Sequence, residues 1–219
     1  MSKPMTKGSE DRTKKTYAES ARSLAEYFSS LDAREDDIER AFDLVGGTQN
    51  SAVLELGCGD GRDASAILKR TRNYTGIDYS KGLIELAKQS NPGHDDRFLV
   101  ADMRSFAPAD GQRYAIIFAF ASLIHLEPSE LKSVLEKYID MLRPGGIIYV
   151  SMKYSDHHIT TTKEDKHGWR LYHLYSPEEL SAMIPESTEV YKNICIRISK
   201  NMAVSSGLPK PFGGKIKWQ

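Results

Sequence analysis

Short, continuous apolar runs that alternate with amphipathic segments constrain the fold of this chain more than any other feature. The runs cover residues 52–56, 73–77, 97–101, 114–121, 147–152 and 190–198. The segments between them repeat apolar residues every three or four positions, as one-sided helices do. A strand whose apolar residues are continuous rather than alternating is buried on both faces, which is typical of parallel sheets covered by helices. The sequence therefore predicts an α/β fold with a doubly wound, mostly parallel sheet.

The composition is typical of a soluble globular protein without a strong electrostatic field of one sign. The 219 residues are 40% hydrophobic and 27% charged, which excludes a disordered chain, a collagen and a coiled-coil rod. Thirty Lys and Arg balance thirty Asp and Glu, which argues against nucleic acid or an anionic membrane as the main partner. Two cysteines exclude a disulfide framework, the start lacks an apolar signal segment, and residues 115–124 reach about half a membrane span. We therefore expect a cytoplasmic protein.

The chain is predicted to form one domain at residues 17–219 behind a polar lead. Residues 1–16 have almost nothing to bury and are predicted to be flexible. Residues 17–47 show two amphipathic helices, the second over 34–44, which end at a Gly-Gly pair and form a helical cap. Residues 154–176 have the length of a substrate lid and are predicted to be a lid-like insertion.

A glycine-rich turn follows the first predicted strand. Gly57, Gly59 and Gly61 allow positive φ and a close approach of the backbone to a ligand. A dinucleotide fingerprint would need its third glycine at position 62, which is Arg62. Glu55, two residues before the first glycine, does little for a pyrophosphate but suits a cationic amino group. The turn therefore favours a cationic cofactor over a dinucleotide, with a purely structural strand-to-helix turn as the alternative.

Two carboxylates stand at the ends of the next two predicted strands. Asp78 follows the second strand, where a carboxylate accepts both hydroxyls of a ribose and repels a 2′-phosphate. Asp102 follows the third strand, where it can accept from the exocyclic amino group of an adenine. Either residue alone would equally suit a helix cap or a solvated loop. Because parallel sheets bind ligands at the carboxyl ends of their strands, the two together predict an adenosine-bearing ligand.

Five motifs in a fixed order carry a resemblance to a known family: VLELGCGDGRDA, YTGIDYS, FLVADM, YAIIFAFASLIHL and LRPGG. Together they resemble the class I S-adenosylmethionine-dependent methyltransferases over residues 17–198, and among these the compact bacterial small-molecule enzymes. The resemblance implies a Rossmann-like methyltransferase fold of seven strands, the last antiparallel, and S-adenosyl-L-methionine as the cofactor. The motifs are specific for the cofactor and say little about the methyl acceptor.

The resemblance also implies contacts with each part of the cofactor. The methionyl part would be held by Glu55 and the loop from Gly57 to Gly61, the ribose by Asp78, and the adenine by Tyr79, Asp102 and the backbone at Met103, with a carbonyl near Ala119 for the amino group. The sequence departs from the family pattern at Ala115, at Phe120 and before the sixth strand. The best candidate for the seventh strand is short and covers residues 215–218.

A methyl acceptor that loses a proton needs a proton-accepting residue beside the methyl group. His125 matches a family histidine near the transferring methyl, and a neutral imidazole there can accept a proton or orient the substrate. Tyr17, on the N-terminal cap, is implied to reach the cofactor's carboxylate, and Arg62 suits the same carboxylate. The alternatives are a histidine bonded to backbone, an aromatic packed on its own helix and a solvated arginine.

Residues 169–175 alternate as a strand would and are predicted to wall the acceptor pocket or to cover a sheet edge. Arg170 within this stretch offers a bidentate grip on a carboxylate or phosphate. The adjacent His157 and His158 have no partners at metal-ligand spacing, so no metal site is predicted.

The sequence thus predicts a methyltransferase that moves a methyl group by in-line displacement to an N, O or S nucleophile of a small molecule. The alternatives are a methyltransferase acting on RNA or protein, a non-catalytic S-adenosylmethionine-binding module, and a nicotinamide oxidoreductase, which Arg62 disfavours. Nucleic acid and membrane are not expected as partners, and the sequence leaves open whether the protein is a monomer or a homodimer.

Overall fold

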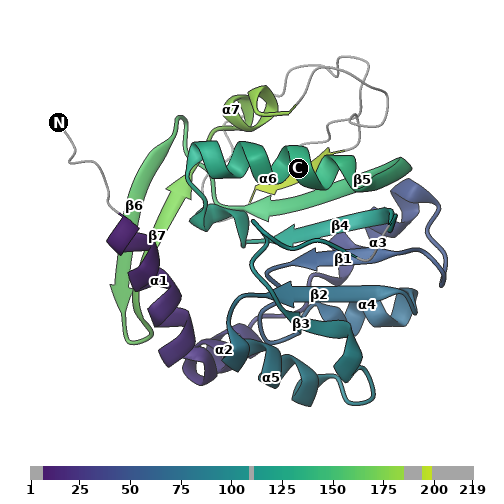
Figure 1. Ribbon diagram of the computed structural model, residues 1–219, viewed down its shortest axis with the longest axis horizontal. Helices are drawn as coiled ribbons and strands as arrows, with labels where there is room; N and C mark the ends of the chain where they lie inside the picture. The colour runs from purple at the N-terminus through teal and green to yellow at the C-terminus, as the bar shows by residue number, and fades with distance from the viewer. Residues whose placement is uncertain (1–6, 109–110, 185–193, 199–219) are drawn as a thin grey trace.

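The computed structural model describes residues 7–108, 111–184 and 194–198 as helices, strands and the loops between them (Figure 1). Its strands are β1 (Val53–Leu56), β2 (Tyr74–Asp78), β3 (Phe98–Val100), β4 (Tyr114–Phe120), β5 (Leu142–Met152), β6 (Ile159–Asp165), β7 (Gly168–Leu174) and β8 (Ile194–Ile198). Its α-helices are α1 (Lys7–Glu19), α2 (Ala21–Ser29), α3 (Glu35–Val45), α4 (Ala64–Arg70), α5 (Lys81–Ser90), α6 (Pro128–Asp140) and α7 (Pro177–Ala182), with 3-10 turns η1 (Asp95–Arg97) and η2 (Leu123–His125).

Six of the strands form one parallel sheet in the order β3-β2-β1-β4-β5-β8. The register places Leu54 of β1 between Thr75 of β2 and Ile117 of β4. The predicted α/β fold with a mostly parallel sheet is confirmed, and each of the six predicted apolar runs overlaps a strand. The chain order reverses between β3-β2-β1 and β4-β5, so the switch point of the sheet lies between β1 and β4.

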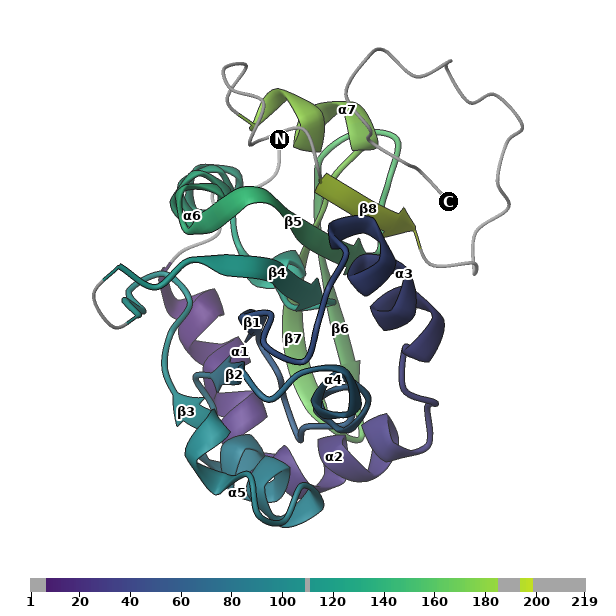
Figure 2. The ribbon, with the colours of Figure 1, turned by 90° about the vertical axis from the view of Figure 1, so that its right-hand side faces the viewer.

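Helices cover both faces of this sheet, as Figures 1 and 2 show together. On one face α6 buries Leu131, Leu135 and Tyr138 in a core with residues of β1, β4 and β5. On the other face α3, α4 and α5 pack a second core, to which α3 contributes Phe42 and α4 contributes Ile67. The sheet is therefore buried on both sides, which is the physical reason that its strands are apolar without alternation.

The N-terminal helix α1 corrects the prediction of a flexible lead. Residues 7–16 are helical rather than free, and residues 1–6 lie outside the described part. Thr13 and Thr16 are buried, and the Thr16 hydroxyl donates to the Trp169 carbonyl at 2.6 Å. The Leu171 amide donates to Thr13 Oγ1 at 3.0 Å. Two threonine hydroxyls thus tie α1 to β7, and this tertiary contact replaces the apolar burial that the sequence lacks.

The segment predicted as a lid-like insertion forms an antiparallel hairpin of β6 and β7. The strand predicted at 169–175 corresponds to β7, whereas β6 is a strand that the sequence reasoning missed. Most of β6 is exposed, so no apolar pattern marks it. Figure 1 shows the hairpin beside α1, on the side toward which the arrows of β1, β2, β4 and β5 point.

At the other edge of the sheet, β8 pairs in parallel with β5. The candidate seventh strand at residues 215–218 lies outside the described residues. Within the described residues, no helix is long and apolar enough to cross a membrane.

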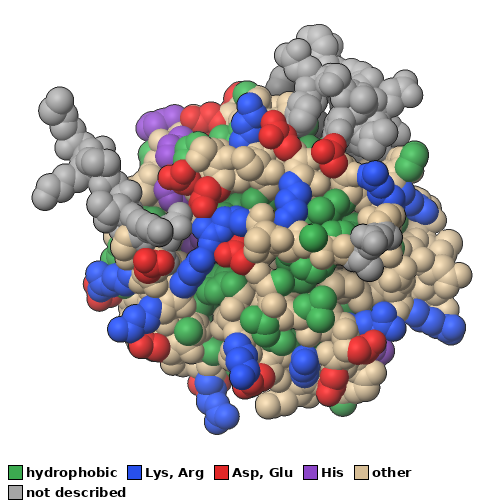
Figure 3. All heavy atoms as spheres, in the orientation of Figure 1, with side chains coloured by type: hydrophobic (Ala, Val, Ile, Leu, Met, Phe, Trp, Pro, Cys, Tyr) green, Lys and Arg blue, Asp and Glu red, His purple; other side chains and the backbone are tan. Residues whose placement is uncertain are grey.

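Lys and Arg side chains are interspersed with Asp and Glu on the face drawn in Figure 3, in keeping with the net charge of zero.

Candidate functional site

A cavity of about 320 Å³ opens at the carboxyl ends of β1, β2 and β4. Its wall combines the glycine-rich loop, the ends of β2 and β3, the turn after β4, helix α1 and the hairpin. Ten of the twelve predicted site residues line it: Tyr17, Glu55, Gly57, Gly59, Arg62, Asp78, Tyr79, Asp102, Met103 and His125. Parallel strands place their carboxyl ends at one edge, so residues far apart in the sequence meet there.

Gly61 and Ala119 are the two predicted site residues that the structure does not bring to the cavity. A Cβ on Gly61 would lie 2.6 Å from Asn91 Nδ2, so this glycine allows close packing against α5 rather than ligand approach. Ala119 is fully buried inside β4, paired with Val150, and the cavity wall begins one residue later at Phe120.

The glycine-rich loop turns sharply because its three glycines have positive φ. Gly57, Gly59 and Gly61 have φ values of 71°, 58° and 76°, a region that residues with a Cβ rarely adopt. A Cβ on Gly57 would meet the Cβ of Ser122 at 2.5 Å, so this position is also sterically closed. Gly59 lines the cavity, and no heavy atom lies within 4 Å of its ideal Cβ position. The loop thus leaves an open place where a ligand can approach the backbone.

Glu55 brings a buried carboxyl to the cavity wall at the end of β1. Its side chain accepts a hydrogen bond from the Tyr74 hydroxyl at 2.6 Å, and the residue is 1% exposed. Burial, followed by the nearby charge of Asp63, raises the pKa of Glu55 to about 8. A bound cation would reverse this shift by favouring the ionised carboxylate, so Glu55 can hold an ammonium group.

Asp78 ties the end of β2 to the glycine-rich loop. Its Oδ2 accepts from the Gly59 amide at 3.1 Å, and its Oδ1 accepts from the Ser80 amide at 2.8 Å. Burial raises the pKa of Asp78 to about 6, and these two amides oppose the increase. Each carboxylate oxygen keeps a second lone pair, so Asp78 can still accept the hydroxyl groups of a ribose.

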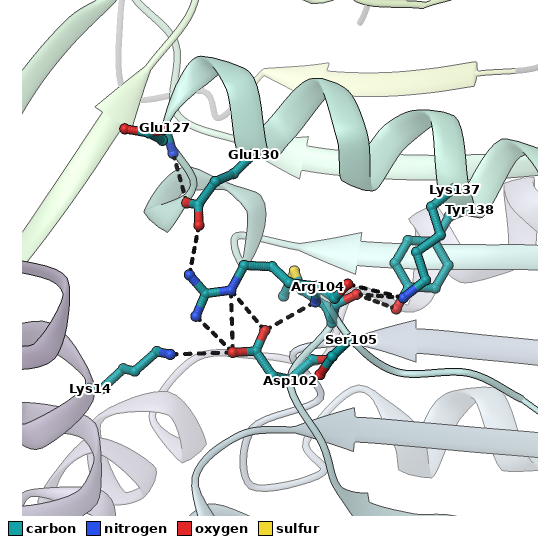
Figure 4. A network of polar contacts seen from close by, with 9 residues as sticks. Lys14, Asp102, Arg104, Ser105, Glu127, Glu130, Lys137 and Tyr138 are labelled. Carbon is teal, nitrogen blue, oxygen red and sulfur yellow. Dashed lines mark hydrogen bonds and ion pairs between the residues drawn. The ribbon is translucent and has the colours of Figure 1, made fainter. Parts of the chain in front are cut away.

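Asp102 is engaged in a network of ion pairs, which Figure 4 shows from close by. Lys14 Nζ lies 3.2 Å from its Oδ2, and Arg104 Nη2 lies 2.7 Å from the same oxygen. Burial alone would raise the pKa of Asp102, but the hydrogen bonds and charge of Arg104, with Lys14, hold it well below its usual range. An adenine amino group would therefore share this carboxylate with two cations. The Met103 carbonyl accepts from the Tyr138 hydroxyl at 2.8 Å.

The buried hydroxyl of Tyr79 indicates that this cavity binds a ligand. Its hydroxyl is buried and has no hydrogen-bond partner among the described residues, which is a costly arrangement unless another molecule completes it. The ring lines the cavity between the ends of β2 and β3. Together with the open backbone at Gly59 and the acids Glu55 and Asp78, this residue fits a ligand with an ammonium group, hydroxyls and an aromatic base.

Tyr17 and His125 form a hydrogen-bonded pair at the hairpin side of the cavity. The Tyr17 hydroxyl lies 3.0 Å from His125 Nε2, and His125 Nδ1 lies 2.7 Å from the Leu171 carbonyl oxygen. A carbonyl only accepts, so Nδ1 carries the ring proton and Nε2 accepts from Tyr17. Burial lowers the pKa of His125 to about 4, which keeps the ring neutral at pH 7. Tyr17 was predicted to reach the cofactor's carboxylate, and its hydroxyl is instead directed at His125.

Two arginines meet one carboxylate at the start of α4. Arg62 Nη2 and Arg34 Nη1 each lie 2.6 Å from Asp63 Oδ2. Both arginines line the cavity, so the pair shares the place predicted for Arg62 alone. Arg34 was missed because it precedes α3 in a stretch without a motif, and only the packing of the helical cap against the loop brings it here. Phe120 lies under the Arg34 guanidinium, 4.9 Å from ring centroid to Cζ.

Comparisons with known proteins find methyltransferases. Residues 53–146 match the model of a methyltransferase domain family. The chain is 32% identical over 110 residues to tRNA N(3)-methylcytidine methyltransferase trm140 of Schizosaccharomyces pombe, covering 44% of this chain and 34% of that protein. It is 33% identical over 103 residues to trans-aconitate 2-methyltransferase of Delftia acidovorans, covering 46% and 37%. The chain thus spans little more than a third of these relatives' lengths.

Solved structures share the fold. The 1,6-didemethyltoxoflavin-N1-methyltransferase of Burkholderia thailandensis, with bound S-adenosylhomocysteine, aligns with a TM-score of 0.64 at 18% identity, covering 84% of this chain and 80% of that one. The motifs, the sheet and the match of residues 53–146 together support a class I S-adenosylmethionine-dependent methyltransferase domain in this chain, and S-adenosylmethionine is the cofactor of that family. Among the described residues, no group of three or more His, Cys, Asp or Glu is arranged to hold a metal ion.

Proposed function

We propose that this protein transfers the methyl group of S-adenosylmethionine to an N, O or S nucleophile of a small molecule. One observation carries the proposal. A single cavity joins the glycine-rich loop, Glu55 and Asp78, which suit the cofactor, to the Tyr17–His125 pair, which suits an acceptor that loses a proton. A binding module without catalysis would have no need of a neutral, oriented imidazole at this place.

The residues of the cavity divide the work of the reaction. When bound, S-adenosylmethionine supplies an electrophilic methyl group: the acceptor's lone pair forms the new bond, and the electrons of the broken carbon–sulfur bond stay on the sulfur of S-adenosylhomocysteine. Glu55 holds the ammonium group and Asp78 the ribose, which fixes the direction of attack. Helix α1 and the hairpin line the cavity on the acceptor side and exclude water there.

The Tyr17–His125 pair accounts for the proton that a neutral acceptor must lose. The acceptor's proton passes to the Tyr17 oxygen as the Tyr17 hydroxyl proton moves to His125 Nε2. The Leu171 carbonyl keeps the other ring nitrogen protonated, so the resulting imidazolium has a partner on both sides. Since burial disfavours the imidazolium, the proton returns to solvent after the product leaves.

A small acceptor is favoured over RNA by the covering of the site. The hairpin and α1 stand over the cavity, and the face in Figure 3 presents no field of one sign. The similarity to trans-aconitate 2-methyltransferase supports a small molecule, whereas the similarity to the tRNA methyltransferase keeps RNA as the second candidate. RNA binding whose affinity falls steeply with salt would favour that second candidate.

Calorimetric titration of the full chain with S-adenosylmethionine, S-adenosylhomocysteine and NADH tests the proposal first. We expect binding of the two sulfur ligands and none of NADH. A panel of small amines, alcohols, thiols and acids, assayed by release of S-adenosylhomocysteine, then tests turnover. A folded protein that ignores both sulfur ligands at millimolar concentration would contradict the proposal, as would binding without turnover of any class of acceptor.

A further inference from the structure

The β6–β7 hairpin brings two cations to the acceptor side of the cavity. Lys163 of β6 and Arg170 of β7 are register partners across the hairpin, and both line the cavity. Lys163 Nζ lies 2.9 Å and Arg170 Nη2 lies 2.6 Å from the same oxygen, Oδ2 of Asp165. Two positive charges thus meet one negative charge, which leaves this corner of the wall with a net charge of about +1.

Arg170 is buried but incompletely paired. The residue is 4% exposed, and its Nε is buried without a hydrogen-bond partner among the described residues. A guanidinium has five N–H donors in a planar fork, and a buried donor left unpaired costs about 1–3 kcal/mol. Asp165 occupies only the Nη2 side of the fork. The side chain is therefore built to receive a second acceptor from the cavity that it lines.

The position of Arg170 places such an acceptor beside the reacting centre. The next residue, Leu171, supplies the carbonyl that holds His125, and the Tyr172 ring lies 5.2 Å from the His125 ring. The charge of Arg170 is near enough to act on the pKa values of both Tyr17 and His125, although burial dominates both. A group held by Arg170 therefore lies next to the nucleophile that the Tyr17–His125 pair would deprotonate.

A second pair of cations in the cavity wall suits the cofactor's carboxylate. Arg34 and Arg62 meet at Asp63, at the start of α4 and directly after the glycine-rich loop. Lys163 and Arg170 instead stand on the hairpin, which packs on α1 and η2. One carboxylate on the cofactor cannot account for both sets, which leaves the hairpin cations for the acceptor.

We propose that the methyl acceptor carries an oxyanion, either a carboxylate or a phosphate-type group, which Arg170 and Lys163 bind beside Tyr17 and His125. This rests on the proposed function, and it narrows the acceptor from any small nucleophile to an anionic one. The guanidinium offers the anion its Nε–H and the other N–H donors that Asp165 leaves free, and the half-exposed lysine adds a second positive charge. A neutral molecule of the same shape would leave the net positive charge that remains beside Asp165 uncompensated.

The test uses the full chain saturated with S-adenosylhomocysteine and titrated calorimetrically with matched probes. The anionic probes are succinate, citrate, inorganic phosphate and methylphosphonate, and the neutral ones are succinamide and dimethyl methylphosphonate. The variants are Arg170→Met, Lys163→Met and the control Lys69→Met, an exposed lysine paired with Glu35 away from the cavity. Lys163 is 55% exposed, so its variant tests the proposal even where Arg170→Met fails to fold.

We expect the wild type to bind at least one class of anion and no neutral probe. Arg170→Met and Lys163→Met should weaken anion binding at least tenfold and threefold, while Lys69→Met and the affinity for S-adenosylhomocysteine stay as in the wild type. Preference for the carboxylates or for the phosphate-type probes identifies which oxyanion the acceptor carries.

Other outcomes overturn the proposal in distinguishable ways. Equal binding of neutral and anionic probes, or anion binding that both variants retain, refutes the hairpin subsite while leaving the proposed function intact. A tenfold loss of S-adenosylhomocysteine affinity in Arg170→Met assigns the hairpin cations to the cofactor's carboxylate instead. No binding of S-adenosylhomocysteine by the folded wild type refutes the proposed function, and with it the assignment of any anion to a methyl acceptor.

Discussion

Asp78 is the residue whose substitution tests the cofactor site most directly. The residue is 8% exposed, and its carboxylate accepts hydrogen bonds from two backbone amides, those of Gly59 and Ser80. Asp78→Ala removes these two acceptors together with the proposed partner of the ribose hydroxyls. Hydrogen bonds to a charged group contribute about 1.5–3 kcal/mol, so affinity for S-adenosylhomocysteine should fall about 10- to 150-fold.

The variant also disturbs the loop, and a double-mutant cycle separates the two effects. Wild type and Asp78→Ala are each titrated calorimetrically with S-adenosylhomocysteine and with its 2′,3′-dideoxy analogue. Loss of the ribose hydroxyls should weaken binding to the wild type but barely affect the variant, which gives a coupling of about 1.5–3 kcal/mol. A shift of the loop alone weakens both ligands equally and gives no coupling.

Thermal unfolding of the free protein provides the control. Because the Gly59 and Ser80 amides lose their acceptor, Asp78→Ala should be destabilised by about 1–3 kcal/mol, whatever the ligand does. A coupling within about 0.5 kcal/mol of zero in a folded variant refutes the ribose role, since distant groups are additive within that range. Asp78 would then serve only to fasten the glycine-rich loop to β2.

Further predictions concern proton transfer and ion pairs. Because burial raises the pKa of Glu55 to about 8, its carboxyl is mostly protonated in the free protein at pH 7, and binding of S-adenosylmethionine should release up to one proton from it. Calorimetry in buffers of different ionisation enthalpy measures this release, and a release that persists in Glu55→Gln would contradict the prediction. Because the pKa of Glu55 is raised in the folded state, its contribution to the stability of the free protein is largest below about pH 4.5 and should be lost as the pH rises through 8. Urea unfolding at pH 5.5 and 8.5 measures this loss, which should be absent in Glu55→Gln. His125→Ala and Tyr17→Phe should each lower kcat at least tenfold and leave cofactor affinity within threefold of the wild type, because the proposed role of this pair concerns the acceptor. Equal losses in kcat and in cofactor affinity would indicate that the two residues have only a structural role. Asp102→Asn should lower the free energy of unfolding by up to about 1 kcal/mol at pH 7. Because the pKa of Asp102 is lowered in the folded state, the difference in unfolding free energy between variant and wild type should shrink below about pH 4.

The strands and the glycine-rich loop could be predicted because each follows from a pattern of neighbouring residues in the sequence. Continuous apolar runs report burial on both faces of a sheet, so β1, β2, β4 and β5 were found with ends within a few residues. Gly57 and Gly59 predict a turn with positive φ, and Ser80 is the N-cap of α5, a position that serine favours. Each of these signals lies within a few neighbouring residues and needs no knowledge of the distant chain.

The helical state of residues 7–16 could not be predicted in this way. Their sequence is polar, and its order comes from Thr13 and Thr16, whose hydroxyls bond to the backbone of β7 more than 150 residues later. The exposed strand β6 is likewise set by its partner β7, since its own threonines and charges form no apolar pattern. Tertiary hydrogen bonds overrode composition in both cases.

By itself, the sequence determined the class of fold, the glycine-rich loop and the carboxylates at the strand ends, because periodicity and residue type are enough to specify burial and backbone turns. Only the tertiary structure decided which side chains meet across the cavity. It directed Tyr17 to His125, 108 residues away, joined Arg34 to Arg62 at Asp63, and brought Arg170 to the wall of the same cavity. Such pairings depend on the path of the whole chain, and no local pattern encodes the distance between residues that only the folded sheet brings together.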